Sequence, residues 1–282
     1  MQNVIQSKTK YIFKAILFCS VFIVLFIGFT ATLNFLPRYL VSNNFIGLYR
    51  GIIGIFVGLL TTKLFLRIDK KTFADIGLIW QRNTIVRFFK GAVMGLIIMG
   101  FFAGSVIYFT NARIEINHKS SLSQFLLASV PIFLLAFMEE LGFRAYPLQI
   151  LTGKVGIRIA IITTSILFAL SHIVMGWTVT SAFGPAIWGL VFGLSAIYSK
   201  GIAMPTGIHY AINLTTSAFG EENSTVSIWT IKQSSSTTAN YPGIDWATIL
   251  PAFILLVFAI ICIELYIRRN PTANIGSANS GA

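Results

Sequence analysis

Charged side chains are scarce in this sequence of 282 residues, because Asp, Glu, Lys and Arg together make up only 11% of it. Soluble globular domains carry about 25% charged residues, so this composition excludes an ordinary soluble domain. The two cysteines, Cys19 and Cys262, have the spacing of neither a disulfide framework nor a metal-binding knuckle. The longest polar stretch, Gly220–Trp246, is rich in Ser and Thr and has no helical period. No separate soluble domain is therefore predicted.

Long apolar runs fill the rest of the chain, with apolar residues at 55% and a mean hydropathy of +0.79. One helix needs about 20 apolar residues to cross the hydrocarbon core of a bilayer. Backbone polar groups must be satisfied internally in lipid, which favours helices. The sequence therefore predicts an all-α, polytopic transmembrane bundle of about eight helices, forming a single membrane domain over residues 1–282. The expected spans are Tyr11–Leu36, Phe45–Phe65, Val86–Phe109, Leu122–Gln149, Ile157–Met175, Ser181–Ser199, Ile202–Phe219 and Ala247–Ile267.

The net charge of +12 is explained by topology. With eight spans, most basic residues fall on the side of the membrane that holds both termini. Loops rich in Lys and Arg stay in the cytoplasm, so both termini are expected there. Orientation and contact with lipid headgroups then account for the charge, and no nucleic-acid partner is predicted. The basic residues on the side of the termini are Lys8, Lys10, Lys14, Arg67, Lys70, Lys71, Arg82, Arg87, Lys90, Arg268 and Arg269, and those opposite are Arg38, Arg50, Arg113, Lys119 and Lys232.

Five ionisable side chains are predicted to lie deep in the membrane: Glu139, Glu140, Arg144, His172 and His209. Such groups are costly in hydrocarbon and usually mark function. Glu140 and Arg144 are four residues apart, so they share a helix face and can form an ion pair. Glu139 lies about 100° around the same helix and is left available for chemistry. The alternative is that these three residues form one packing network.

His209 and Asn213 are also four residues apart, on one face of their predicted helix. Counted at about 1.5 Å per residue, Glu139, His172, His209 and Asn213 reach similar depths. A buried carboxylate is a good base near neutral pH, and a histidine beside it can share or steer a proton of water. Two donors on one helix face suit an oxyanion site. These four residues are the predicted catalytic set, against the alternative that each histidine is a packing residue of the core.

The polar residues occur in three spaced motifs: Glu139-Glu140-x-x-x-Arg144, Phe168-x-x-x-His172 and His209-x-x-x-Asn213. This order, on three separate apolar segments, resembles the CPBP family of CAAX-protease and bacteriocin-processing intramembrane endopeptidases, sometimes called Abi. The similarity covers Leu122–Phe219, the expected catalytic core. It implies an eight-helix intramembrane protease that hydrolyses peptide bonds with an activated water. The expected substrate is a membrane-associated peptide or protein, and the expected location is the plasma membrane of a prokaryote.

The resemblance also implies roles for the motif residues. In this family the first glutamate and the histidine of the second motif activate the water, and the third motif stabilises the oxyanion. Carried over, Glu139 and His172 take the first role, and His209 and Asn213 take the second. The residues expected to support this site are Glu140, Arg144 and Phe168.

No cofactor is favoured, and zinc is the alternative. Members of the family have also been classified as metalloproteases, and two His with one Glu form a catalytic zinc set. In this chain that set would be Glu139, His172 and His209. The H-E-x-x-H signature of soluble zinc proteases is absent from the sequence. We therefore prefer a metal-free glutamate mechanism.

Two rival functions use the same residues. An immunity or scaffold protein would bind a membrane-active peptide without cleaving it and would tolerate replacement of Glu139. A proton-coupled transporter would use Glu139 and Glu140 as a proton relay. The sequence lacks the matching halves and paired broken helices that many transporters have.

Overall fold

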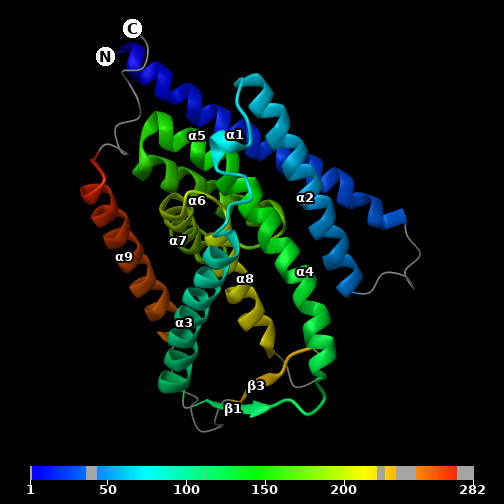
Figure 1. Ribbon diagram of the computed structural model, residues 1–282. Coiled ribbons are helices and arrows are strands. Elements are labelled where there is room, and N and C mark those ends of the chain that lie inside the picture. The colour runs from blue at the N-terminus through cyan, green and yellow to red at the C-terminus, as the bar shows by residue number, and fades with distance from the viewer. Residues whose placement is uncertain (1, 36–42, 111, 221–225, 233–245, 272–282) are drawn as a thin grey trace.

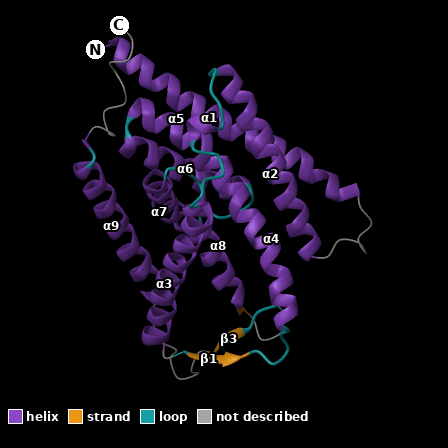
Figure 2. Cartoon of the chain, in the orientation of Figure 1, coloured by secondary structure: helices purple, strands orange, loops and turns teal. Residues whose placement is uncertain are grey.

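The computed structural model describes residues 2–35, 43–110, 112–220, 226–232 and 246–271. They form an all-α bundle, as predicted, with a small sheet at one end (Figure 1; Figure 2). Two short 3₁₀ turns, Ala31–Phe35 and Ala74–Ile76, follow α1 and precede α3. The helices are α1 (Gln2–Thr30), α2 (Asn43–Ile68), α3 (Thr84–Thr110), α4 (Leu122–Glu140), α5 (Tyr146–Val155), α6 (Ile157–Val174), α7 (Phe183–Ser199), α8 (Ala203–Ala218) and α9 (Trp246–Arg269).

All eight predicted apolar segments are helical, and the fourth of them consists of α4 and α5 joined by a π-helical turn. Among the described residues, six segments are long and apolar enough to cross a membrane. The two others, α7 and α8, have 17 and 16 residues. The chain is therefore an integral, multi-pass membrane protein.

The π-helical turn, Leu141–Ala145, has a cause in the sequence. Pro147 follows it within the first turn of α5 and lacks a backbone N–H, so it cannot bond to the carbonyl four residues earlier. A π-turn, in which hydrogen bonds span five residues, absorbs this break. The sequence predicts a kink from Pro147, and the structure has this turn in its place, with all five of its residues buried.

The bundle has two distinct ends. The start of α1 and the end of α9 lie at one end, which we call the termini end, and the strands lie at the other, the sheet end (Figure 1). The strands are β1 (Arg113–Ile116), β2 (Phe219–Gly220) and β3 (Trp229–Lys232), in the order β1-β3-β2. β3 pairs antiparallel with β1 and parallel with β2. The sequence analysis did not predict this sheet, because strands of two to four residues carry too little alternation to be recognised.

A buried aromatic and polar cluster fixes α5 at the termini end. Phe18 of α1 stacks on Tyr146 with ring centroids 4.9 Å apart, and Phe65 of α2 meets Phe18 edge-on at 5.1 Å. The Tyr146 hydroxyl donates to Asp69 Oδ2 at 2.6 Å, and Lys14 pairs with the other oxygen of Asp69. Because Tyr146 directly follows the π-turn, this cluster also holds the turn in place.

α8 is held by close packing on α3. Gly91 and Gly95 lie against the backbone of Met204 and Ile208, where an added Cβ would collide with a carbonyl oxygen. Small residues at such interfaces let membrane helices approach closely. This packing sets the rotation of α8 and therefore the direction of His209, which follows Ile208.

Candidate active site

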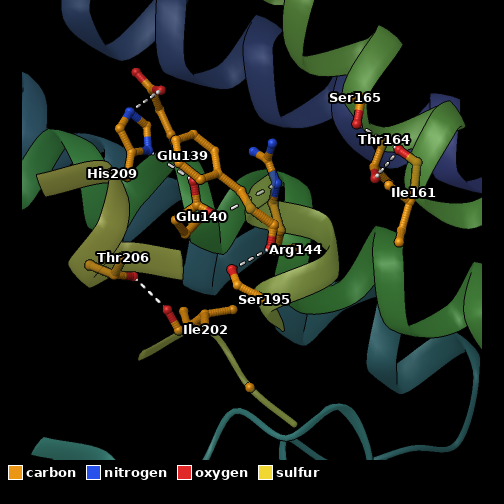
Figure 3. Close-up of polar contacts among 12 residues, drawn as sticks. Glu139, Glu140, Arg144, Ile161, Thr164, Ser165, Ser195, Ile202, Thr206 and His209 are labelled. Atoms are coloured by element: carbon orange, nitrogen blue, oxygen red, sulfur yellow. Dashed lines mark hydrogen bonds and ion pairs between the residues drawn. The ribbon is translucent and has the colours of Figure 1, made fainter. Parts of the chain in front are cut away.

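The predicted ion pair is present at the end of α4. Arg144 Nε lies 3.5 Å from Glu140 Oε2, and both side chains have 0% exposure (Figure 3). The spacing of four residues brings them together, as expected, even though Arg144 lies in the π-turn. Neither charge reaches water, so each depends on the other for neutralisation.

His209 of α8 lies between the two glutamates. Its Nδ1 is 2.8 Å from Glu140 Oε1, and its Nε2 is 3.5 Å from Glu139 Oε2. A carboxylate only accepts hydrogen bonds, so Nδ1 carries the proton in the first contact. The sequence analysis expected Glu139 to point away from Glu140. The two carboxylates do leave the helix in different directions, but each reaches a different nitrogen of one imidazole ring.

The ring of His209 is surrounded by three charged groups. Glu139 and Glu140 bring two negative charges and Arg144 brings one positive charge. Buried charges are costly unless they are paired, and Arg144 pairs with Glu140. The two ring nitrogens of His209 face different carboxylates, Nδ1 that of Glu140 and Nε2 that of Glu139.

Two phenylalanines pack between the charged groups. The guanidinium carbon of Arg144 lies 4.3 Å from the centroid of Phe168 and 5.2 Å from that of Phe192. Phe192 also stacks on the ring of His209, at 4.6 Å and an interplanar angle of 17°. Rings in these positions stabilise a buried cation. Phe168 was predicted to support the site, whereas Phe192 was missed, because a phenylalanine in an apolar helix carries no signal of its own.

The Phe-x-x-x-His spacing of α6 has a direct structural effect. His172 Nδ1 lies 2.9 Å from the carbonyl oxygen of Phe168. A carbonyl can only accept, so Nδ1 bears the proton and Nε2 keeps its lone pair in the neutral ring. The ring meets Phe168 edge-on at 4.7 Å and Trp177 at 4.9 Å. His172 is therefore fixed in the tautomer that can accept a proton at Nε2.

Glu139 and His172 line one cavity of about 640 Å³, formed by α1, α2, α4 and α6. Ligand sites in proteins usually have about 300–1,000 Å³. Glu139 has 23% of its side chain exposed. Its buried Oε2 accepts no hydrogen bond within the described part of the chain. The lining also includes Thr30 at the end of α1, Gly47 and Arg50 near the start of α2, and Met175 and Trp177 just after α6.

Asn213 is the predicted residue for which the structure gives no polar contact. It lies one turn beyond His209 on α8 and is half-buried. It does not line the cavity of Glu139, and it has no hydrogen bond to any described residue. Its expected role as an oxyanion donor stays a prediction that rests on its spacing from His209.

The alternative zinc set does not form a metal site in the described residues. No three His, Cys, Asp or Glu side chains are grouped there in a way that could hold a metal ion. His209 Nε2 lies 3.5 Å from Glu139 Oε2, and His172 keeps its Nε2 free as an acceptor.

A multi-pass bundle that encloses carboxylates, an arginine and histidines among apolar helices defines an integral membrane protein with an ionisable site within the bundle. Residues 121–215 match a family model described as "Type II CAAX prenyl endopeptidase Rce1-like". This match contains all three motifs, and it supports over residues 121–215 the resemblance that those motifs indicate. The matched family consists of endopeptidases, and the remainder of the chain lies outside the match. A comparison with curated proteins gives no match.

Proposed function

We propose that this protein cleaves peptide bonds of membrane-associated substrates with a water molecule activated by Glu139 and His172. One observation carries the proposal: Glu139 and His172, from two helices, line the same cavity. Glu139 offers a carboxylate oxygen without a hydrogen-bond partner among the described residues, and His172 offers Nε2 as an acceptor. The two groups can therefore hold and deprotonate one water between them.

The reaction follows from these roles. Oxygen of the water attacks the carbonyl carbon of the scissile bond, and its proton passes to Glu139. The carbonyl oxygen becomes an oxyanion in the tetrahedral intermediate. When the C–N bond breaks, the proton moves to the leaving nitrogen, which gives a carboxylic acid and an amine as products. Glu139 is then ready to accept a proton again.

His209 stabilises the oxyanion in this proposal, with help from Asn213. Its contact with Glu140 fixes the ring through Nδ1, and Nε2, 3.5 Å from Glu139 Oε2, donates to the oxyanion when it carries a proton. Phe192 stacks on the ring and keeps its plane constant. A donor that is already oriented stabilises the transition state without reorganisation. Glu140 and Arg144 act on the reaction through His209.

The cavity opens away from the cytoplasm in our proposal. Its lining includes the last residue of α1, which begins at the termini end, and Met175 and Trp177, which follow α6 and are exposed. Basic residues are concentrated at the termini end, which supports a cytoplasmic location for that end. Substrates would then reach Glu139 from the outer face of the membrane.

The test compares processing of membrane proteins in cells that carry the wild type or Glu139→Gln. Gln keeps the shape of the side chain but cannot take the proton, so processing should stop while the protein still folds. Glu115→Gln, which makes the same change on β1 at the surface, is the matched control and should process normally. A folded Glu139→Gln protein that still cleaves its substrates would exclude Glu139 as the base. Function retained without cleavage would favour the immunity or scaffold protein.

A further inference from the structure

A second cavity, separate from that of Glu139, lies between α9 and the helices α3, α7 and α8. Its volume is about 620 Å³, within the usual range of ligand sites. Residues of α9 line it at steps of three and four positions from Leu255 to Arg269, which is one face of the helix. Phe258 and Leu265 of this face are exposed, and α9 lies at the outside of the bundle beside α3 (Figure 1). We call this cavity the α9 groove, and it faces the surrounding lipid.

The polar groups of the α9 groove are gathered at its termini end. Arg269 and Asn270 line it where α9 ends, together with Tyr198 and Tyr266, whose ring centroids are 6.5 Å apart. The remaining lining is almost entirely apolar, and the hydroxyl of Ser195 already donates to a carbonyl of its own helix. Tyrosine and arginine side chains are typical of the level of the lipid headgroups. The groove therefore has a polar end at the membrane surface and an apolar length below it.

The positive charge at the polar end has no acidic neighbour in the groove. Arg269 forms no ion pair within the described part of the chain, and no acidic residue lines the groove. The acidic residue of α9, Glu264, comes five positions earlier and so points about 140° away around the helix. Both of its carboxylate oxygens accept hydrogen bonds from Arg158, at 2.6 Å each. The α9 groove is therefore complementary to an anion at its polar end.

The length of the groove matches one leaflet of the bilayer. Arg269 follows Leu255 by 14 positions, which is about 21 Å along the helix axis. A bilayer is about 40–45 Å thick with its headgroups, so one leaflet takes up about 20–22 Å. An acyl chain with a headgroup can therefore occupy the whole groove, whereas a small soluble anion would leave its apolar part empty.

We propose that the α9 groove binds one anionic phospholipid of the leaflet at the termini end, with its phosphate at Arg269 and an acyl chain along α9. A guanidinium binds phosphate through two parallel N–H···O bonds. Basic pockets between membrane helices on the cytoplasmic side bind anionic headgroups in this way, and the termini end is the end expected in the cytoplasm. The bound lipid fills the space between α9 and α7 and so joins the last helix to the bundle. The site is independent of peptide cleavage.

The experiment compares two lipids on the full chain, purified in detergent and stripped of lipid. Phosphatidylglycerol and phosphatidylcholine with the same acyl chains are titrated, and bound lipids are counted by native mass spectrometry. One phosphatidylglycerol should bind about 5- to 10-fold more tightly than phosphatidylcholine, whose ammonium group offsets its phosphate. Arg269→Gln should abolish this preference. Arg268→Gln is the matched control, because it removes the adjacent positive charge, which does not line the groove, and it should keep the preference.

A second variant tests the apolar part of the groove. Cys262 lines it about 10 Å below Arg269, so Cys262→Trp should fill it and weaken the binding of both lipids. Cys19, which has 2% exposure, stays unreactive towards a thiol reagent if this variant is folded. Normal lipid binding by folded Cys262→Trp would place the lipid elsewhere and refute the site.

Three further outcomes would overturn the proposal. Equal affinity of the wild type for the two lipids, or a preference that survives Arg269→Gln, would exclude an anionic headgroup at Arg269. Glycerol phosphate, which has the anion without acyl chains, should not bind at concentrations that saturate the lipid, and binding of equal strength would make this a site for a soluble anion. A dimer that Cys262→Trp separates would assign the groove to a second copy of the chain.

Discussion

Removal of Glu140 should destabilise the protein more than removal of Arg144, although the two form one ion pair. Glu140→Gln leaves the guanidinium with 0% exposure and with no charged partner except the more distant Glu139. Its nitrogen atoms already donate no hydrogen bond to any described residue. Breaking one partner of a buried pair costs about 3–5 kcal/mol. Glu140→Gln also weakens the 2.8 Å contact with His209, and a charged hydrogen bond contributes about 1.5–3 kcal/mol.

Arg144→Met should reduce the free energy of unfolding by an amount near the lower end of this range. Glu140 keeps its hydrogen bond from His209 after the change, so its charge still has a partner. Methionine also fills part of the space over Phe168 that the guanidinium occupies. The double variant carries neither charge, so its loss of stability should be smaller than the sum of the two single losses by about 1–3 kcal/mol.

The chain contains its own reporter for this measurement. Cys19 has 2% exposure in the folded protein and becomes reactive only when α1 separates from the bundle. Unfolding of detergent-solubilised protein by denaturant can be followed with a thiol-reactive dye in a Cys262→Ser background. Single losses that add to within about 0.5 kcal/mol would show that Glu140 and Arg144 do not act as a pair.

His209→Ala and Asn213→Ala should each lower kcat about 100- to 1000-fold with little change in KM, because an oxyanion donor acts on the transition state; a rise in KM alone would assign them to substrate binding. Purified active enzyme should contain no stoichiometric zinc, and zinc that disappears in His209→Ala would make that residue a ligand. A cysteine at His118, exposed at the sheet end, should react with an impermeant reagent in intact cells; labelling only after lysis would reverse the topology. Hydrogen bonds from the backbone N–H and then the hydroxyl of Thr72 lower the pKa of Asp75. A carboxylate with a lowered pKa stabilises the folded turn at pH values above the pKa of the unfolded chain. Protection of this turn from hydrogen exchange should therefore fall as the pH drops through the folded pKa, below about 4. Asp75→Asn should remove that dependence.

The eight apolar segments could be predicted because membrane helices follow from length and hydropathy alone. The pair of Glu140 and Arg144 could also be predicted, since contacts within one helix depend only on spacing. The bracketing of His209 by both glutamates could not, because a contact between helices depends on how each helix is rotated. That rotation is set by distant packing, such as Gly91 of α3 against α8.

Arg50 and Phe192 are two further residues whose places could not be predicted from the sequence. The sequence analysis used Arg50 only as a basic residue that marks topology, and the cavity shows that it lines the same space as Glu139. Phe192 becomes part of the site only because α7 brings it against His209 and Arg144. The sequence thus predicted the polar groups of the candidate site, but not the neighbours that pack against them.

The short length of α7 and α8 has a consequence for the bilayer itself. At 1.5 Å per residue, 17 and 16 residues reach about 25 Å, whereas the hydrocarbon core is about 30 Å thick. The bilayer beside these helices must therefore become thinner, or the helix ends must lie below the surface of the bilayer. Either response shortens the path from bulk water to His209, which lies about 9 Å from the start of α8. Catalysis in this protein should consequently depend on acyl-chain length, and bilayers of longer lipids should slow it by moving water away from the site.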